Sequence, residues 1–246
     1  MFMDTASRTA IVTGGSRGIG RAVAVRLAAA GQDVAVVYSS NAKEADAAVG
    51  EIEAAGARGI ALQADVADED TIAGAFDTVE QRLGPIDVVV NAAGIMALQP
   101  IRELDLAQLD RQLRTNVRGT FVTAKEAARR IRPGGAFVAF STSVTRLHLP
   151  AYGAYAATKG AVEALIPILA KEMGDRDVTV NAVAPGPTAT ELFFEGKSQQ
   201  VIDRIAGLSP MNRLGTPEDV AELVAFLAGP GRWINGQIVF ANGGAA

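Results

Sequence analysis

Short apolar runs rich in β-branched residues alternate with longer helix-forming stretches along almost the whole chain. This alternation is typical of repeated strand–helix–strand units and predicts a parallel sheet. Several of the runs are apolar at consecutive positions, as expected for strands that helices cover on both faces. The predicted strands are Ala10–Thr13, Val34–Tyr38, Gly59–Gln63, Asp87–Asn91, Ala136–Phe140, Val178–Val183 and Ile238–Phe240. The predicted helices are Ile19–Ala30, Ala42–Ala55, Glu69–Leu83, Leu106–Ile131, Ala154–Met173 and Pro217–Leu227.

No proline- or serine-rich linker and no internal repeat divides the 246 residues, so we expect a single domain. Residues 1–8 are expected to form a tail before the first strand. One long irregular segment with several prolines and glycines begins at Pro185 and runs to about Arg213. Because such loops in compact domains are usually functional or disordered, we predict that residues 187–212 form a lid over a substrate site.

Composition narrows the classes of function. Hydrophobic residues make up 49% of the chain, which is enough for an extensive core. The net charge of −4 argues against nucleic acid, whose binding needs a basic face, and 5% aromatics leave few platforms for base stacking. No apolar run approaches the roughly 18 to 20 residues of a membrane span.

Cysteine and histidine are nearly missing from the sequence. Zero cysteines exclude disulfides, thiol catalysis and thiolate metal sites, and His148 alone cannot supply a multi-histidine metal site. The start of the chain has neither the basic nor the apolar region of a secretion signal. We therefore expect a cytoplasmic protein without a metal.

The segment Thr13–Gly20 reads Thr-Gly-Gly-Ser-Arg-Gly-Ile-Gly, after a predicted strand and at the start of a predicted helix. In this context Gly14 allows a tight turn, Gly18 lets backbone approach a pyrophosphate, and Gly20 lets the helix pack close to the sheet. The helix N-terminus stabilises the negative charge. The segment therefore predicts dinucleotide binding. Its spacing differs from the commonest fingerprint, and the alternative is an ordinary glycine-rich turn.

The second predicted strand ends in the sequence Tyr38-Ser39-Ser40-Asn41, and no carboxylate follows before Glu44. An acidic residue there would bond the ribose 2′-hydroxyl of NAD and repel a 2′-phosphate. Arg17 in the glycine turn can supply a cation to that phosphate. These features favour NADP(H), although Arg17 has an alternative reading as a solvated surface residue.

Tyr155 and Lys159 stand four residues apart on a predicted helix, which puts them on one face, one turn apart. The unperturbed pKa of tyrosine is about 10, so the phenol transfers protons at neutral pH only if a cation stabilises the phenolate. The pair therefore suits general acid–base catalysis. Taken alone, the same spacing is common on solvated helix faces.

The ordered set of motifs resembles the short-chain dehydrogenase/reductase family, in particular ketoacyl-carrier-protein reductases and fungal hydroxynaphthalene reductases. The resemblance extends from about Arg8 to Gly244 and is carried by Thr13–Gly20, Asp65, Asn91-Ala92-Ala93-Gly94, Asn116, Tyr155, Lys159 and Asn181–Gly186. It implies a single-domain, Rossmann-like, doubly wound parallel α/β sheet of about seven strands. It also implies a homotetramer, with Leu106–Ile131 and Ala154–Met173 as the main interface helices.

The resemblance further implies a role for each matching residue. Tyr155 is the general acid in carbonyl reduction and the base in oxidation, and Lys159 lowers the pKa of the tyrosine and bonds the nicotinamide ribose. Asn116 holds a water that links Lys159 to solvent, and Thr190 bonds the nicotinamide carboxamide. The residues expected to bind the cofactor are Gly14, Ser16, Arg17, Gly18, Ile19, Gly20, Tyr38, Ser39, Ser40, Asn41, Asp65, Val66, Asn91, Ala92, Ala93, Gly94, Tyr155, Lys159, Pro185, Gly186, Thr188 and Thr190.

Three positions depart from the family pattern. The catalytic serine should follow the fifth strand, where the chain reads Phe140-Ser141-Thr142-Ser143. Counting from the strand gives Thr142 as the catalytic hydroxyl, with Ser143 as the alternative if the loop is one residue shorter. Ala92 replaces a frequent asparagine. Pro167 lies inside the predicted Tyr155 helix and predicts a kink.

Together these features predict an NADP(H)-dependent oxidoreductase that transfers hydride between nicotinamide and a ketone or secondary alcohol. The alternative is a dinucleotide-binding sensor or interaction protein without turnover. A methyltransferase on a similar sheet lacks the terminal carboxylate on the second strand. Phe193 and Phe194 are interpreted as lid residues or as the core of a small helical layer. His148 is interpreted as a surface residue or as a residue that contacts substrate, and Trp233 is interpreted as part of a subunit contact.

Overall fold

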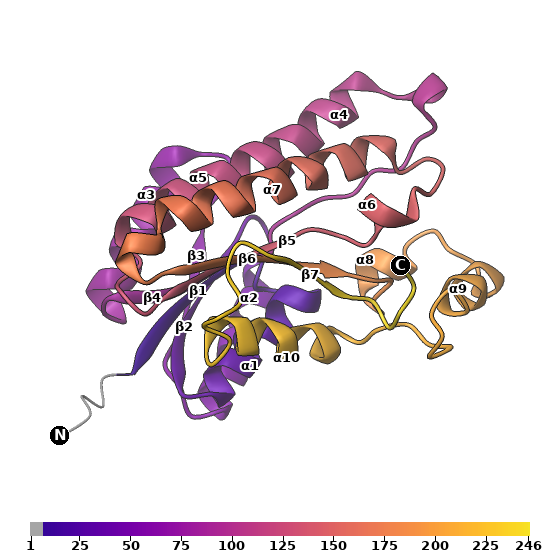
Figure 1. Ribbon diagram of the computed structural model, residues 1–246. Helices are drawn as coiled ribbons and strands as arrows, with labels where there is room; N and C mark the ends of the chain where they lie inside the picture. Colours follow the sequence, from indigo (N-terminus) through magenta and orange to yellow (C-terminus); the bar gives the residue numbers. More distant parts are fainter. Residues whose placement is uncertain (1–6) are drawn as a thin grey trace.

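The computed structural model describes residues 7–246, which form one seven-stranded sheet between two layers of helices (Figure 1). The strands are β1 (Arg8–Thr13), β2 (Gln32–Tyr38), β3 (Gly59–Gln63), β4 (Ile86–Asn91), β5 (Ala136–Phe140), β6 (Thr179–Pro185) and β7 (Ile238–Ala241). Their order in the sheet is β3-β2-β1-β4-β5-β6-β7, and every neighbouring pair is parallel. This confirms the predicted Rossmann-like, doubly wound sheet. Each predicted strand is present, with ends shifted by at most two residues.

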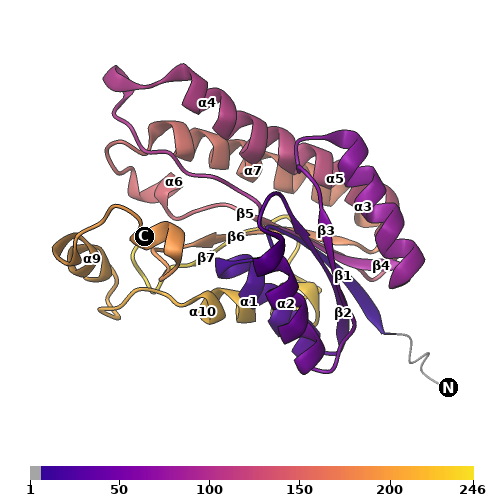
Figure 2. The same ribbon diagram turned by 180° about the vertical axis from the view of Figure 1, so that it is seen from behind.

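Three long helices cover each face of the sheet (Figures 1 and 2). One layer holds α1 (Gly18–Ala29), α2 (Ala42–Ala54) and α10 (Pro217–Ala228), and the other holds α3 (Glu69–Arg82), α5 (Gly119–Arg130) and α7 (Gly153–Glu172). Each layer has its own apolar core. Leu27, Ile52 and Leu227 are fully buried on the first side, and Phe76 and Ile166 on the second.

The strand order reverses between β1 and β4. In sheets of this type, ligands bind in the crevice that opens at the carboxyl ends of the strands at such a reversal. The glycine turn after β1 and the polar residues after β4 and β5 all lie at this edge. The topology therefore brings together the motifs that the sequence analysis identified.

The predicted helix over 106–131 is divided into three parts. It consists of α4 (Leu106–Gln112), a π-helical segment η2 (Leu113–Arg118) and α5. A π-helical turn carries one residue more than an α-turn and is frequent at functional sites. Asn116 lies in this segment, so the wider turn sets the position of its side chain.

The helix α7 runs without interruption across Pro167, although proline cannot donate a hydrogen bond to the carbonyl group four residues earlier. A kink at this point stays a prediction. The same helix carries Tyr155 and Lys159, so the proline lies C-terminal to both.

The predicted irregular segment over 187–212 contains two short helices, α8 (Glu191–Phe194) and α9 (Gln199–Ala206). The Thr190 hydroxyl caps the first by accepting a bond from the Phe193 amide at 3.2 Å. Helices this short do not show a clear periodic pattern of apolar residues, so the sequence does not predict them. The role of the segment as a lid stays a prediction.

Three further short elements complete the chain: η1 (Ile101–Glu103), α6 (Val144–Leu147) and η3 (Gly174–Arg176). β1 begins at Arg8, so the last residue of the predicted tail belongs to the sheet, and residues 1–6 of that tail lie outside the described part. No helix within residues 7–246 is both long enough and apolar enough to cross a membrane.

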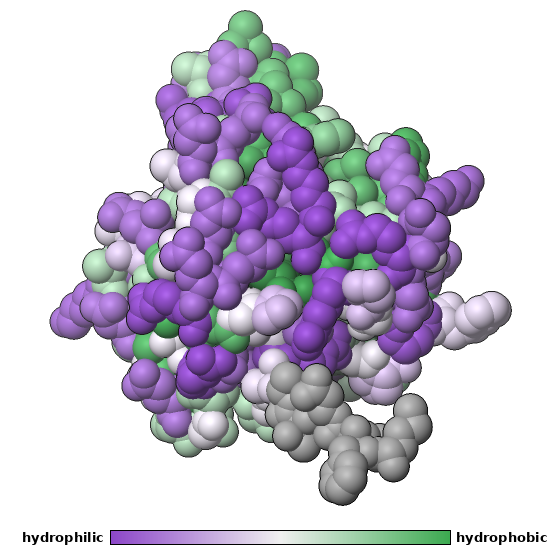
Figure 3. Space-filling model, turned by 90° about the vertical axis from the view of Figure 1, so that its left-hand side faces the viewer, coloured by the Kyte–Doolittle hydropathy of each residue, from purple (hydrophilic) through white to green (hydrophobic). Residues whose placement is uncertain are grey.

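The face where the strands begin is covered largely by hydrophilic side chains (Figure 3). Ion pairs join neighbouring strand starts there. Arg58 binds Asp33 through Nε and Nη2 at 3.0 and 2.7 Å, and Arg132 binds Asp87 through Nε and Nη2 at 2.5 and 3.0 Å. Both nitrogens of Arg58 reach the same oxygen, Oδ2 of Asp33, whereas those of Arg132 reach one oxygen each of Asp87. Paired charge-assisted bonds on nearly buried carboxylates fix geometry well. Ion pairs therefore hold the sheet together at the end where the strands begin, whereas the end where the strands finish is open.

Candidate active site

A cavity of about 570 Å³ opens at the carboxyl ends of the strands. Of the predicted cofactor residues it is lined by Gly14, Ser16, Arg17, Gly18, Ile19, Gly20, Tyr38, Ser39, Asp65, Val66, Ala92, Ala93, Gly94, Tyr155, Lys159, Pro185, Gly186, Thr188 and Thr190. Ser40, Asn41 and Asn91 do not line it. The cavity therefore brings together nearly the whole predicted set, from segments as distant as β1 and α8.

The glycines of the first turn are required by geometry. Gly14 has φ +66°, and a Cβ added there would lie 2.8 Å from the Ala93 backbone. Gly18 has φ +53°, a conformation that side chains rarely adopt. A Cβ on Gly20 would lie 2.2 Å from the Gly14 oxygen. The turn is thus as tight as the sequence predicts, and its backbone is exposed to the cavity.

The N-terminus of α1 faces this cavity without a capping side chain. Arg17 occupies the N-cap position but makes no side-chain cap, and the first turn of α1 holds no acidic residue. Free amide groups and the helix dipole suit a phosphate at such a terminus. Arg17 is exposed at the cavity rim, and no ion pair within residues 7–246 involves it. Its guanidinium is therefore available to an anionic ligand.

Asn41 caps a helix, and its role in binding the cofactor stays a prediction. Its Oδ1 accepts a bond from the Glu44 amide at 3.3 Å and so caps α2. Asparagine is a preferred N-cap because its side chain satisfies an orphan amide. Tyr38 and Ser39 line the cavity from the end of β2, whereas Ser40 is exposed beyond it.

Asp65 and Val66 line the cavity between β3 and α3, as predicted for an adenine border. The carboxylate of Asp65 is already engaged. Its Oδ1 accepts from the Ala67 amide at 2.9 Å, and its Oδ2 pairs with Nη2 of Arg114 at 2.5 Å. Arg114 belongs to η2, so this pair links the cavity edge to the segment that carries Asn116.

Asn91 does not line the cavity, and its role in binding the cofactor stays a prediction. Its Oδ1 accepts from the Thr13 hydroxyl at 2.9 Å, and its Nδ2 donates to the Thr120 hydroxyl at 2.9 Å. These bonds join β1, β4 and α5 beneath the cavity. The side chain of the last strand residue points into the protein, and only the following Ala92, Ala93 and Gly94 reach the cavity.

Asn116 is buried and does not line the cavity. Its Nδ2 donates to the Ile95 carbonyl at 2.8 Å and to the Thr158 hydroxyl at 3.1 Å, while its Oδ1 accepts from the Ile95 amide at 2.8 Å. Asn116 thus fastens the segment after Gly94 to α7. The predicted water relay to Lys159 stays a prediction.

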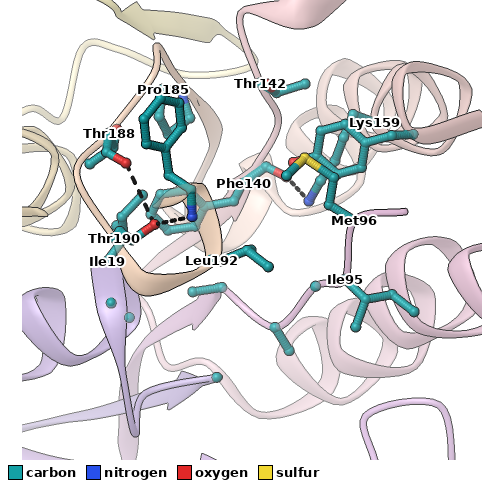
Figure 4. Close-up of a pocket in the computed structure, with 18 of the residues that line it drawn as sticks. Ile19, Ile95, Met96, Phe140, Thr142, Lys159, Pro185, Thr188, Thr190 and Leu192 are labelled. Atoms are coloured by element: carbon teal, nitrogen blue, oxygen red, sulfur yellow. Dashed lines mark hydrogen bonds between the residues drawn. The ribbon is translucent and has the colours of Figure 1, made fainter. Parts of the chain in front are cut away.

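Lys159 is buried beside the end of β5, where its Nζ donates to the Phe140 carbonyl at 2.8 Å (Figure 4). The same atom lies 5.9 Å from the centre of the Tyr155 ring. Burial lowers the pKa of Lys159 to about 8, since the charged form is poorly solvated. Figure 4 shows Thr142, Met96 and Lys159 on one side of the cavity and Thr188, Thr190 and Ile19 on the other.

The expectation that Lys159 lowers the pKa of Tyr155 does not hold in this structure. Burial raises the pKa of Tyr155 to about 12, the hydrogen bond with Thr142 lowers it in part, and the nearby phenol of Tyr152 raises it. Burial of the phenol is the largest influence on its pKa, and the Lys159 ammonium donates to the Phe140 carbonyl. Tyr155 is therefore protonated at neutral pH, as a proton donor must be.

Thr142 is the hydroxyl that lies beside Tyr155. Its Oγ1 accepts from the Val144 amide at 3.3 Å, and the hydroxyl is close enough to the phenol to lower the pKa of Tyr155 in part. Ser143 is turned the other way, and its Oγ donates to the Ala184 carbonyl at 3.3 Å. Both residues line the cavity, but the geometry favours Thr142 over Ser143 as the partner of Tyr155.

Part of the apolar lining and several polar residues were not expected from the sequence. The additional apolar side chains include Ile95, Met96, Val144, Leu147, Leu149 and Ile205, and the additional polar ones include Thr115, Tyr152 and Glu191. Tyr152 stands three residues before Tyr155, and this spacing was the signal that could have identified it. The other side chains come from loops and short helices, whose folding the pattern of apolar positions does not describe.

Of the four aromatic and imidazole side chains singled out in the sequence, only one lines the cavity. Phe193 lines the cavity, whereas Phe194 is exposed and does not. His148 is exposed outside the cavity with φ +50°. Trp233 is fully exposed before β7, and its predicted subunit contact stays a prediction.

Comparisons with known proteins agree with this geometry. A family model described as enoyl-(acyl carrier protein) reductase matches residues 14–246. The chain is 42% identical, over 98% of its length and 95% of the relative, to an NADPH-dependent aldehyde reductase-like chloroplastic protein of Arabidopsis thaliana. It is 42% identical, over 96% and 92%, to a short-chain type dehydrogenase/reductase of Picea abies. A solved short chain dehydrogenase from Burkholderia cenocepacia in complex with NADP superposes with a TM-score of 0.91, at 41% identity over 98% of both chains.

Proposed function

The chain belongs to the short-chain dehydrogenase/reductase family, and we propose that it is an NADP(H)-dependent carbonyl reductase or alcohol dehydrogenase. One observation carries the proposal. The glycine turn with its uncapped helix and the group of Thr142, Tyr155 and Lys159 line the same cavity. Dinucleotide binding alone does not need a proton donor opposite the turn, so this combination argues against a sensor without turnover.

The residues present fit the dinucleotide. Gly14, Gly18 and Gly20 leave room for backbone to approach a pyrophosphate, and the free amides of α1 would hold its charge. When bound, NADPH supplies the hydride. Arg17 would meet the 2′-phosphate, and the end of β2 offers no carboxylate to repel it. The NADPH dependence of the Arabidopsis relative and the NADP bound in the Burkholderia structure support this preference.

The chain's own residues provide the proton and hold the charge on the oxygen. Tyr155 would donate its phenolic proton to the substrate oxygen, and the reverse reaction would use the phenolate as a base. Thr142 would donate a hydrogen bond to the same oxygen and orient it. Lys159 would stabilise the negative charge that the phenol acquires. Asn116 would hold the water that returns a proton to Lys159.

The lining of the cavity supports a largely apolar substrate without an anionic group. Met96, Leu147, Leu149 and Phe193 line the cavity together with Thr142 and Tyr155, and Arg17 and Lys159 are the only cations among the described lining residues. Arg17 belongs to the glycine turn and Lys159 is bonded to main chain, so neither is placed to hold a substrate carboxylate or phosphate. We propose an aldehyde or ketone without a carboxylate or phosphate next to the carbonyl.

A reductase assay tests this function. The purified protein is mixed with NADPH or NADH and a panel of aldehydes and ketones, in neutral and carboxylated pairs, and coenzyme absorbance is followed. We expect turnover with NADPH and preference for the neutral member of each pair. NADPH binding without turnover on the whole panel would instead identify the sensor.

We also propose that the protein acts as a cytoplasmic homotetramer. Exposed apolar side chains on the expected interface helices support assembly: Leu106 on α4, Leu113 on η2, Phe121 on α5 and Ile168 on α7. Light scattering on the purified protein tests the mass of the assembly. A monomer at micromolar concentration would contradict it.

A further inference from the structure

One face of α7 carries three polar side chains at a spacing of four residues: Tyr155, Lys159 and Glu163. On an α-helix such residues form one stripe. The first two line the cavity. Glu163 lies one turn beyond Lys159 and does not reach the cavity, but it contacts the loop that carries Thr142.

The carboxylate of Glu163 holds that loop on both sides of Thr142. Its Oε1 accepts from the Ser141 hydroxyl at 2.5 Å and from the Thr145 hydroxyl at 2.9 Å. The Thr145 hydroxyl also lies 2.9 Å from the carbonyl oxygen of Thr142 itself. Hydrogen bonds to an ionised acceptor are stronger than neutral ones, so one carboxylate oxygen fixes the residues before and after Thr142.

No other partner explains this carboxylate. Glu163 is partly buried, and none of the ion pairs within residues 7–246 involves it. A carboxylate withdrawn from water is costly unless it accepts hydrogen bonds, which the two hydroxyls supply. Its two donors both belong to the catalytic loop.

The other bonds of this loop lead to β6. The amide of Ser141 donates to the Val183 carbonyl at 2.8 Å, and the amide of Ser143 donates to the Pro185 carbonyl at 2.8 Å. These bonds place the loop relative to the sheet. Glu163 instead ties it to α7, the helix that carries Tyr155, so it sets the distance between the two catalytic hydroxyls.

We propose that Glu163 is a positioning residue of the active site, which holds the Ser141–Thr145 loop against α7 and so keeps the Thr142 hydroxyl on the Tyr155 phenol. The role rests on the proposed reductase function. Glu163 does not touch substrate or cofactor. It acts through Thr142.

Substitutions at Glu163 separate positioning from packing. Glu163→Ala removes the acceptor, and we expect kcat to fall about tenfold or more, since small displacements of catalytic groups are expensive. The KM for NADPH should stay within about twofold, because the glycine turn is remote. Glu163→Gln keeps an acceptor oxygen and should recover most of kcat. Glu172→Ala, on the exposed end of the same helix, is the matched control and should be unchanged.

A double-substitution cycle tests the route of the effect. In a Thr142→Val background the catalytic hydroxyl is missing, so adding Glu163→Ala should cost less than about twofold in kcat. Independent losses that multiply in the double variant would overturn the proposal. Should Glu163→Ala fail to fold, Ser141→Ala and Thr145→Val remove the two donors instead, and the same cycle applies to each.

A readout without turnover separates this proposal from the function on which it rests. Hydrogen–deuterium exchange of the peptide over 141–147 should be faster in Glu163→Ala and as slow as wild type in Glu163→Gln. If wild type turns over no carbonyl but this difference in exchange is present, the reductase function is contradicted, while the tether, meaning the hold of Glu163 on the Ser141–Thr145 loop, is supported. Equal exchange in all three proteins would overturn the tether whatever the activity.

Discussion

The Nζ atom of Lys159 and the carbonyl oxygen of Phe140 are joined by a hydrogen bond of 2.8 Å. The bond fastens α7 to the last residue of β5, immediately before the loop with Thr142. Burial controls both pKa values in this structure, lowering that of Lys159 and raising that of Tyr155.

The pH dependence of carbonyl reduction should follow Lys159. Its pKa is lowered to about 8, so the ammonium that stabilises the forming phenolate is present below that pH and lost above it. Tyr155 stays protonated over the same range, since its pKa is raised to about 12. We expect kcat for reduction, measured from about pH 6 to about pH 10, to fall as pH rises through about 8. Lys171→Met, at an exposed lysine of α7, should leave the profile unchanged, and a flat profile in wild type would contradict the assignment.

Removing the phenolic oxygen should abolish catalysis and spare binding. Tyr155→Phe should lower kcat at least about 100-fold, a typical contribution of general acid catalysis. NADPH affinity, measured by fluorescence titration, should change little because the glycine turn is intact. Tyr152→Phe removes a neighbouring phenol and serves as the control, with less than about a tenfold loss. Unchanged turnover in Tyr155→Phe would remove the proposed acid.

The coenzyme preference should depend on Arg17. Arg17→Ala should weaken NADPH about tenfold or more and NADH much less, since a hydrogen bond to a charged group contributes about 1.5 to 3 kcal/mol. Dissociation constants of both coenzymes measure the ratio. Arg102→Ala, at an exposed arginine of η1, is the control. Equal weakening of the two coenzymes would mean that the 2′-phosphate is not bound there.

Two glycines that both lie in helices should respond in opposite ways to substitution by alanine. A Cβ at Gly20 would lie 2.2 Å from the Gly14 oxygen, so Gly20→Ala should lower the free energy of unfolding by about 1 to 3 kcal/mol and weaken NADPH. A Cβ at Gly160, inside α7, would meet nothing within 4 Å. Gly160→Ala should therefore raise stability by about 0.5 kcal/mol. Thermal unfolding of both variants is the measurement, and equal effects would refute the geometry of the turn.

Coenzyme should order the segment over 187–212. Trypsin sites at Lys197 and Arg204 lie in it, and we expect NADP to slow cleavage at both, because a ligand held by Thr190 stabilises the start of α8. The matched ligand is 2′-phospho-ADP-ribose, which lacks the nicotinamide and should protect less. Identical digestion with NADP and without ligand would exclude ordering by the nicotinamide.

The sheet and the glycine turn were predictable because their signals are local. Consecutive apolar residues identify buried strands, and Gly14, Gly18 and Gly20 have a spacing that few other structures require. The direction of a side chain at the end of a helix or strand is not determined by the local sequence pattern. Asn41 follows β2 and Asn91 ends β4, where cofactor residues are expected, yet the side chain of Asn41 caps α2 and that of Asn91 bonds to Thr13 and Thr120.

The remaining differences have the same origin. Thr142 and Ser143 are adjacent hydroxyls, and only the path of the loop decides which one meets Tyr155. The π-helical turn around Asn116 follows from packing. No proline or glycine within Leu113–Arg118 indicates it in the sequence. Glu163 reads as an ordinary helix residue until the fold places two hydroxyls beside it.

The difference between the two ends of the strands has a consequence for engineering this protein. The arginine–aspartate pairs where the strands start hold the scaffold together at the end opposite the cavity. Part of the apolar wall of the cavity comes instead from α6, α8, α9 and the turn before α7, which lie outside the sheet. Randomised libraries at Leu147, Leu149 and Ile205 should therefore yield variants with new ketone preferences at little expense of melting temperature.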